Sequence, residues 1–156
     1  MTQVTEHVTL EELTKSQTGE RLGLDNLPPA AELAALKAVC ENVVEKVRAH
    51  FGKPVHINSG YRGPALNKAV GGASSSQHCK GEAVDMEIPG VPNGDLAIWV
   101  RDNLDFDQLI LECYKPGVPT SGWVHCSYKA AGGNRKDVLT AAMVNGKMTY
   151  SPGIHV

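Results

Sequence analysis

A helical repeat of apolar residues between Pro28 and Gly52 constrains the fold of this chain more than any other feature. Seven apolar positions recur there with the i, i+3, i+4, i+7 spacing of one buried helix face. They are Leu33, Leu36, Val39, Cys40, Val43, Val47 and Phe51. Proline suits the first turn of a helix, and the pattern ends at Gly52. The sequence therefore predicts one long helix whose apolar face lies at the centre of the core.

The segments on either side of this helix have different patterns. Before it, Thr9-Leu-Glu-Glu12 predicts a capping box that opens a short helix, and residues 16–29 predict an ordered connector. After it, the apolar spacing changes to period two, which predicts strands, and Asn145-Gly146 predicts a hairpin. The expected strands are 55–58, 83–88, 106–113, 123–128, 139–144 and 147–150, with a short helix at 95–103. We expect one α+β domain over residues 1–156, with N-terminal helices packed on a small antiparallel sheet.

The composition is that of an ordinary globular protein, with 42% apolar and 21% charged residues. A formal net charge of −2 gives no electrostatic reason to bind nucleic acid or an anionic membrane. No apolar run approaches the roughly 20 residues that cross a bilayer. The first seven residues lack the basic and apolar parts of a secretory signal, so we expect synthesis in the cytoplasm unless a leader precedes the chain. The four cysteines form no CxxC pair, and we expect reduced thiols in a monomeric protein.

Two histidines and one aspartate have the chemistry of a three-ligand metal site. His78 lies in a loop rich in serine and glycine, and Asp85 lies in the next predicted strand. Gly81 allows the chain to turn between them, and His125 projects from another predicted strand. Two imidazoles and one carboxylate suit Zn²⁺ with one position open for water. Spacing alone leaves a second interpretation open: a histidine that caps a loop, a hydrogen-bonded carboxylate and a core histidine.

Six segments carry a resemblance to a known family, and they follow one another along nearly the whole chain. They are Ser59-Gly-Tyr-Arg62, Asn67-Lys-Ala-Val-Gly-Gly72, Ser76-Gln-His78, Gly81-Glu-Ala-Val-Asp85, Phe106-Asp-Gln-Leu-Ile-Leu-Glu112 and Trp123-Val-His125. Together they resemble the zinc D-alanyl-D-alanine carboxypeptidases, especially the phage-type branch related to L-alanyl-D-glutamate endolysin peptidases. The resemblance implies the zinc carboxypeptidase (hedgehog-like) fold and Zn²⁺ bound by His78, Asp85 and His125. It also implies hydrolysis of an amide bond adjacent to a D-amino acid in peptidoglycan stem peptides.

The resemblance further implies that Arg62 grips the substrate, through either its carboxylate or the carbonyl under attack. A guanidinium is permanently charged and matches a carboxylate with two parallel hydrogen bonds. The alternative for Arg62 is an ordinary surface ion pair. Ser76 and Gln77, beside the first predicted ligand, are further candidates for substrate binding. For Gln77, a role in holding the loop is an equal alternative.

One position departs from the family pattern. Many members of the wider family carry an acidic residue three positions before the second histidine, where it serves as general base. This chain has Gly122 at that position. We therefore predict that Glu112, at the end of a strand, is the catalytic carboxylate, with Asp107 and Glu87 as rivals. The alternative for Glu112 is a partner that orients a ligand histidine.

Three functions compete. We predict a zinc metallopeptidase, either a carboxypeptidase or an endolysin-type endopeptidase, that acts on the cell wall. Small size and the lack of a wall-binding repeat indicate a phage or prophage lysis enzyme. The alternative is a catalytically silent zinc-containing binding or structural module of the same fold, which Gly122 favours. A zinc-free hydrolase with Cys79 or Cys126 as nucleophile is the third hypothesis.

Overall fold

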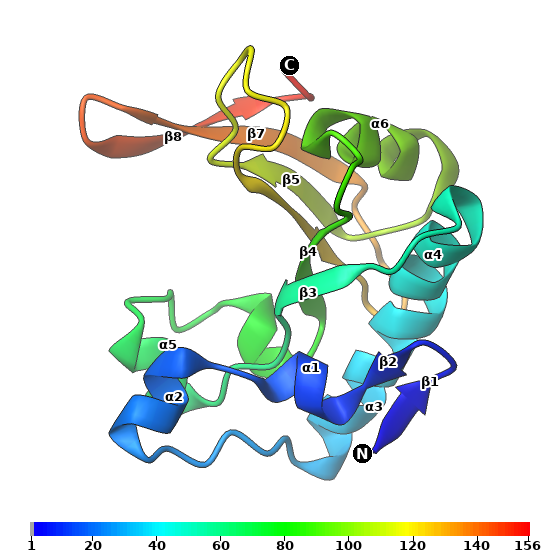
Figure 1. Cartoon of the computed structure of the whole chain (residues 1–156). Helices are drawn as coiled ribbons and strands as arrows, with labels where there is room; N and C mark the ends of the chain where they lie inside the picture. The colour runs from blue at the N-terminus through cyan, green and yellow to red at the C-terminus, as the bar shows by residue number, and fades with distance from the viewer. Residues whose placement is uncertain (1) are drawn as a thin grey trace.

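The computed structural model describes residues 2–156 and has helices and strands in one chain (Figure 1). The helices are α1 (Leu10–Thr14), α2 (Gln17–Leu22), α3 (Ala30–Val39), η1 (Cys40–Val44), α4 (Glu45–Phe51), α5 (Pro64–Ala69), η2 (Gln77–Lys80) and α6 (Asn93–Asn103). The strands are β1 (Gln3–Thr5), β2 (Val8–Thr9), β3 (His56–Ser59), β4 (Ala83–Glu87), β5 (Gln108–Glu112), β6 (Trp123–Ser127), β7 (Asp137–Val144) and β8 (Lys147–Pro152). The predicted α+β class is confirmed.

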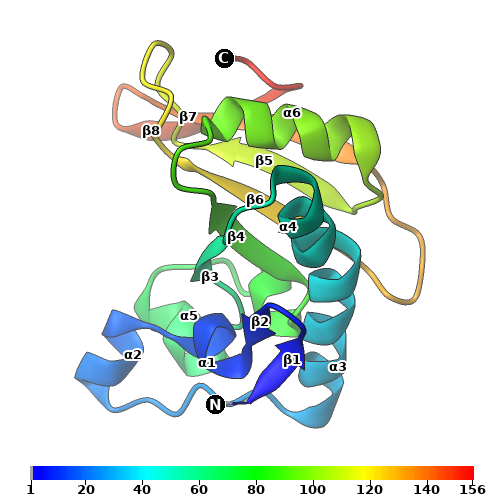
Figure 2. The same ribbon diagram turned by 45° about the vertical axis from the view of Figure 1, so that its right-hand side comes forward.

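The main sheet has six strands in the order β3-β4-β6-β5-β7-β8 (Figure 2). The β5–β7 pair is parallel, and the other neighbouring pairs of this sheet are antiparallel. The prediction of an antiparallel sheet is therefore wrong at this pair. β6 ends beside the start of β5, and residues 128–136 step across that end, so β7 begins there and runs with β5. The hairpin predicted around Asn145-Gly146 is confirmed as β7 and β8.

The long helix is confirmed between Ala30 and Phe51, although its middle is π-helical from Cys40 to Val44. Five positions of its predicted apolar face are completely buried: Leu36, Val39, Cys40, Val43 and Val47. Leu33 is 37% exposed, so the face begins one turn later than predicted. Gly52 ends the helix with a φ of 65°, a conformation that glycine adopts without strain.

The N-terminal region contains the predicted capping box and two elements that were not predicted. The Thr9 hydroxyl accepts from the Glu12 N–H at 3.3 Å, and the Glu12 carboxylate accepts from the Thr9 N–H at 2.8 Å. β1 and β2 pair before the first helix, so helices do not come first. The expected connector contains α2, because the Ser16 side chain caps it by accepting from the Gly19 N–H at 3.1 Å.

The two faces of the main sheet have different roles. One face packs under the long helix and α6 and forms the core (Figure 2). Its strand residues include Val84, Met86, Leu109, Leu111, Val124 and Cys126. Each large apolar side chain buried in this way contributes about 1.5–3 kcal/mol. The alternate residues Asp85, His125 and Glu112 therefore point to the opposite face.

Residues 60–82 bring a loop across that opposite face. At Gly60, a Cβ would lie 2.6 Å from the Leu13 carbonyl oxygen, so only glycine allows this approach to α1. At Gly81, φ is 70° and a Cβ would collide with the Glu32 carbonyl oxygen. Glycine at both positions lets η2 lie against β4, as the prediction for Gly81 required. No helix of the described residues is long and apolar enough to cross a bilayer.

Candidate metal centre and active site

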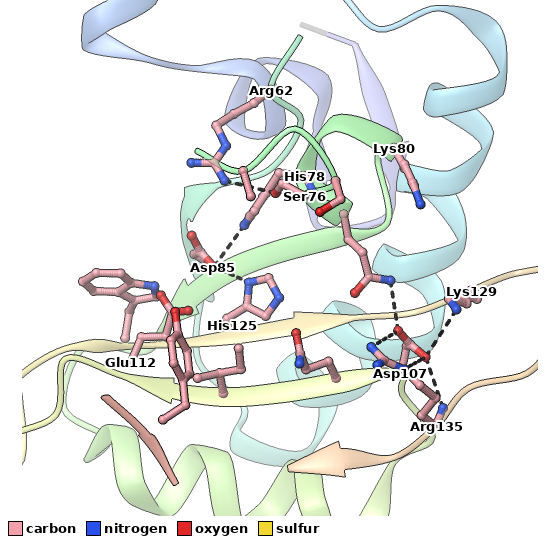
Figure 3. A pocket seen from close by; sticks show the side chains of 17 residues that line it. Arg62, Ser76, His78, Lys80, Asp85, Asp107, Glu112, His125, Lys129 and Arg135 are labelled. Atoms are coloured by element: carbon pink, nitrogen blue, oxygen red, sulfur yellow. Dashed lines mark hydrogen bonds and ion pairs between the residues drawn. The ribbon is translucent and has the colours of Figure 1, made fainter. Parts of the chain in front are cut away.

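His78, Asp85 and His125 meet where η2 lies beside β4 and β6 (Figure 3). Asp85 and His125 are directly opposite each other on neighbouring antiparallel strands. Asp85 Oδ1 lies 3.0 Å from His125 Nδ1 and 3.3 Å from His78 Nε2. One ligand atom from each residue lies within 4.8 Å of the other two. These three side chains therefore form a compact set of two nitrogens and one oxygen, a donor set that fits a zinc ion.

Surrounding contacts orient this set. His78 Nδ1 lies 2.7 Å from the Gly60 carbonyl oxygen and donates its proton there, which leaves Nε2 free toward Asp85. His78 is 3% exposed, so its ring has little freedom to turn. Burial alone raises the pKa of Asp85, but interactions with the neighbouring His125 and His78 rings outweigh it and hold that pKa well below its usual range. Asp85 is therefore ionised, as a metal-binding carboxylate must be.

A cleft of about 590 Å³ contains the three side chains. It is also lined by all the predicted substrate contacts and by several further polar residues. The polar lining includes Arg62, Ser76, Gln77, Lys80, Asp107, Gln108, Glu112, Lys129 and Arg135. The structure thus brings together the predicted ligands, the predicted substrate contacts and the predicted base.

Glu112 lies on the same sheet face as the histidine of β6. In the β5–β6 register, Glu112 faces Trp123, and Ile110 faces His125. Burial raises the pKa of Glu112, and the negative charge of Asp85 raises it further, while the two histidines act in the opposite direction. A carboxyl group with a raised pKa holds a proton more readily near neutral pH, which suits a group that accepts and then donates one.

Asp107 lies in the cleft but is already engaged. Its side chain is fully buried and accepts from Arg135 Nε at 3.1 Å and from the Arg135 terminal nitrogen at 2.9 Å. Gln77 donates to Asp107 at 3.1 Å and to Glu82 at 3.3 Å, and Lys129 Nζ lies 3.7 Å from Asp107. Hydrogen bonds from Arg135 lower the pKa of Asp107 to about 2. A carboxylate held in this way is poorly suited to collect a proton.

Three other predicted candidates lie outside the cleft. Glu87 accepts from Asn58 at 2.8 Å and lines a separate hollow. Cys126 is buried in the core on the opposite face of the sheet, and burial raises the pKa of its thiol. Cys79 lines another hollow, beside α5. Neither cysteine therefore lies where a nucleophile would meet a substrate in the cleft.

Gly122 has a steric explanation. Its φ is 69°, and a Cβ at this position would collide with the backbone carbonyl oxygen of Glu112. Any side chain here would force the end of β5 away from β6. This backbone therefore excludes an acidic residue at position 122, and the same close approach places Glu112 beside the cleft.

Arg62 and Ser76 belong to the wall opposite the sheet. The Ser76 hydroxyl accepts from the His78 N–H at 3.2 Å and from a terminal nitrogen of Arg62 at 3.4 Å. Arg62 Nε is buried and has no hydrogen-bond partner in the structure. Ser76 thus caps η2 and positions the guanidinium, which retains a free donor.

Trp123 and three cationic residues are among the cleft residues that were not predicted as site residues. The indole N–H of Trp123 is buried in the cleft next to Glu112, and its interaction with that carboxyl lowers the pKa of Glu112. Lys80, Lys129 and Arg135 come from η2 and from the loop after β6. Periodicity could indicate only that Trp123 shares a face with His125; loop residues have no periodic signal. Asn134 closes a turn within this loop, because its side chain accepts from the Lys129 N–H at 2.8 Å.

The close approach at Gly122 yields a stability prediction. Gly122→Ala should lower the free energy of unfolding by about 2 kcal/mol or more, because it combines a left-handed backbone with a collision. Gly117→Ala is the matched control, since Gly117 also has a positive φ but no atom of residues 2–156 within 4 Å of its Cβ position. That control should lose only about 1 kcal/mol in urea unfolding. Equal losses in the two variants would contradict the collision.

Asp107 yields a pH-dependent prediction. Its folded pKa of about 2 lies below the usual value, so ionised Asp107 stabilises the fold above about pH 4. Asp107→Asn should lower the free energy of unfolding by about 2 kcal/mol at neutral pH. The gap to wild type should narrow as pH falls from about 4 to about 2. Asp102→Asn, at an exposed ion pair with Arg101, should change stability little at any pH in the same unfolding series.

Comparison with known proteins is consistent with this geometry. A family model described as Peptidase M15 matches residues 6–127, a range that contains the three candidate ligands, Arg62 and Glu112. No curated protein matches the chain significantly. M15 peptidases are typically zinc-dependent, and His78, Asp85 and His125 form a group able to hold such an ion. Family membership indicates a metallopeptidase with a peptide-containing substrate. Because the match covers more than half of the sequence, the chain belongs to the M15 peptidase family.

Proposed function

We propose that this protein is a zinc metallopeptidase that hydrolyses an amide bond adjacent to a D-amino acid in peptidoglycan stem peptides. The observation that carries the proposal is the placement of His78, Asp85 and His125 in one cleft with Glu112 and Arg62. The choice of substrate is supported by the sequence segments that resemble the zinc D-alanyl-D-alanine carboxypeptidases and the phage-type endolysin peptidases. We further propose a single, monomeric domain over residues 1–156, with a hedgehog-like fold, phage or prophage origin and action on the cell wall.

Zinc would be held by the carboxylate of Asp85 and by the ring nitrogens of His78 and His125 that face it. When bound, zinc supplies a Lewis acid that polarises a carbonyl and makes water more acidic. The chain's own contribution is orientation, because the Gly60 carbonyl fixes the His78 ring and the sheet register fixes the other two residues.

Glu112 acts as the proton carrier in this proposal. It accepts a proton from the attacking water as the carbon–oxygen bond forms, and it delivers that proton to the leaving nitrogen as the carbon–nitrogen bond breaks. Burial of Glu112, the main cause of its raised pKa, favours the protonated form and supports this exchange. Its place on the face that carries Asp85 and His125 puts it on the side of the cleft where hydrolysis would occur.

Arg62 binds the substrate. A buried donor without a partner destabilises a protein by about 1–3 kcal/mol, and a substrate carboxylate or carbonyl oxygen would satisfy Arg62 Nε. Ser76 and Gln77 complete this wall: Ser76 holds the guanidinium, and Gln77 ties the loop to Asp107 and Glu82. Their remaining polar groups line the cleft and are available to the peptide.

A catalytically silent zinc-containing module is the second candidate. The lack of an acid at position 122 favours it. The collision at that position supplies a steric reason for the glycine, and Glu112 supplies a carboxylate to the same cleft. Glycine at position 122 is therefore compatible with an active enzyme.

Digestion of purified peptidoglycan tests the proposed reaction. Zinc-loaded protein should release peptides or amino acids whose new ends identify the cleaved bond by mass spectrometry. A chelator should stop the release, and added zinc should restore it. Fully zinc-loaded protein that releases nothing would instead indicate the silent module. Release that continues after complete metal removal would overturn the metal-dependent mechanism.

Glu112→Gln tests the proton carrier. The amide has nearly the same shape but cannot accept the proton, so turnover should fall at least about 100-fold while bound zinc, measured by metal analysis, stays near wild type. Glu87→Gln is the matched control, because it makes the same change outside the cleft. Undiminished turnover in a zinc-loaded Glu112→Gln protein would remove Glu112 from the mechanism without affecting the metal assignment.

A further inference from the structure

One end of the cleft is lined by three cationic side chains that the proposed hydrolysis does not use. Lys80 belongs to η2, and Lys129 and Arg135 belong to the loop between β6 and β7. Figure 3 shows Glu112 to one side of His125 and the Lys129–Arg135 group to the other side. The cleft therefore continues beyond the candidate metal centre into an end that carries cationic side chains.

The buried carboxylate of Asp107 organises this end. Arg135 donates to it through two side-chain nitrogens and through its backbone N–H at 3.1 Å, and Lys129 Nζ lies 3.7 Å away. Asp107 thus holds the loop after β6 against the start of β5. Two further carboxylates lie near this end: Glu82 accepts from the same Gln77 amide as Asp107, and Asp137 accepts from Gln108 and acts on Arg135. What this end offers a ligand is therefore its unengaged ammonium donors and not an excess of positive charge.

The two lysines have capacity left for a ligand. Within residues 2–156, the Lys80 ammonium takes part in no hydrogen bond or ion pair, although it lines the cleft. Lys129 is 37% exposed and meets Asp107 only at ion-pair distance. Arg135 donates to Asp107 through two of its side-chain nitrogens, so it would act on a ligand mainly through its charge. Lys80 and Lys129 are therefore the direct contacts that this end offers.

We propose that Lys80, Lys129 and Arg135 form a subsite for a carboxylate of the bound peptide, separate from the group under attack. This inference rests on the proposed peptidase function and specifies its substrate as an anionic peptide. An extended peptide that crosses the metal centre runs along the cleft, so a carboxylate near the scissile bond meets the lysines. Charge-assisted hydrogen bonds from two ammonium groups then fix its position in the cleft.

Three synthetic stem pentapeptides distinguish the two sources of such a carboxylate. The first has D-glutamate with a free α-carboxylate and a free C-terminus. The second replaces D-glutamate by D-isoglutamine, and the third has a C-terminal amide. The protein variants are Lys80→Gln, Lys129→Gln and their double variant, with Lys46→Gln as a matched loss of charge on α4. Arg135 is left intact, because its removal would leave Asp107 buried beside a single distant lysine.

The double variant should raise KM for the parent peptide about fivefold with little change in kcat, since the subsite binds and does not react. Wild type should show a similar loss on one of the two amidated peptides. The double variant should show no further loss on that peptide, because both changes remove the same contact. Lys46→Gln should behave as wild type on all three.

The subsite is wrong if the double variant keeps the wild-type KM on the parent peptide. It is also wrong if the loss from the lysine changes multiplies independently with the loss from amidation for both amidated peptides. Equilibrium binding of the three peptides to zinc-loaded Glu112→Gln protein, with and without the lysine changes, gives a second readout that needs no turnover. Absence of cleavage with lysine-dependent binding retained would count against the peptidase and for the subsite. Cleavage whose KM does not depend on the two lysines would support the peptidase and count against the subsite.

Discussion

The register between β4 and β6 is the constraint on which the rest of the site depends. Asp85 and His125 stand directly opposite each other, 3.0 Å apart at their nearest polar atoms, and both face away from the long helix and α6. A slip of one residue would turn His125 into the core and bring Cys126 out to the cleft. Burial of Val84 and Met86 on one side of β4 therefore keeps Asp85 on the other. The core and the candidate metal centre therefore lie on opposite faces of the same strands.

Much of this arrangement follows from local patterns in the sequence. Helical spacing predicts the long helix between Ala30 and Phe51, and period two predicts that Asp85 and His125 project from strands. The parallel pairing of β7 with β5 could not be predicted in this way, because it depends on where a loop crosses the sheet. α2 was missed because serine and glycine favour turns as well as helix caps.

The site likewise has parts that local sequence patterns predict and parts that depend on contacts between distant segments. The three ligand candidates stand in recognisable segments, so sequence alone could name them, whereas the cationic end of the cleft is assembled from η2 and a loop distant in the chain. Asp107 shows the difference most clearly. Its residue type made it a rival for the base, but in the folded chain its carboxylate is the counter-ion of Arg135. Arg135, 28 positions later, occupies both of its oxygens. Residue type and spacing alone could not distinguish a proton carrier from the counter-ion of a loop.

Gly122 has a consequence for how such a site can change over evolutionary time. Its lack of a side chain lets β6 approach the carbonyl oxygen of Glu112, so positions 112 and 122 are structurally coupled. A single mutation cannot move a carboxylate from one position to the other, because an acid at 122 would first displace the end of β5. A variant with an acid at 122 would lose stability whether or not residue 112 had also changed. The backbone at this crossing therefore restricts which pairs of residues positions 112 and 122 can carry together.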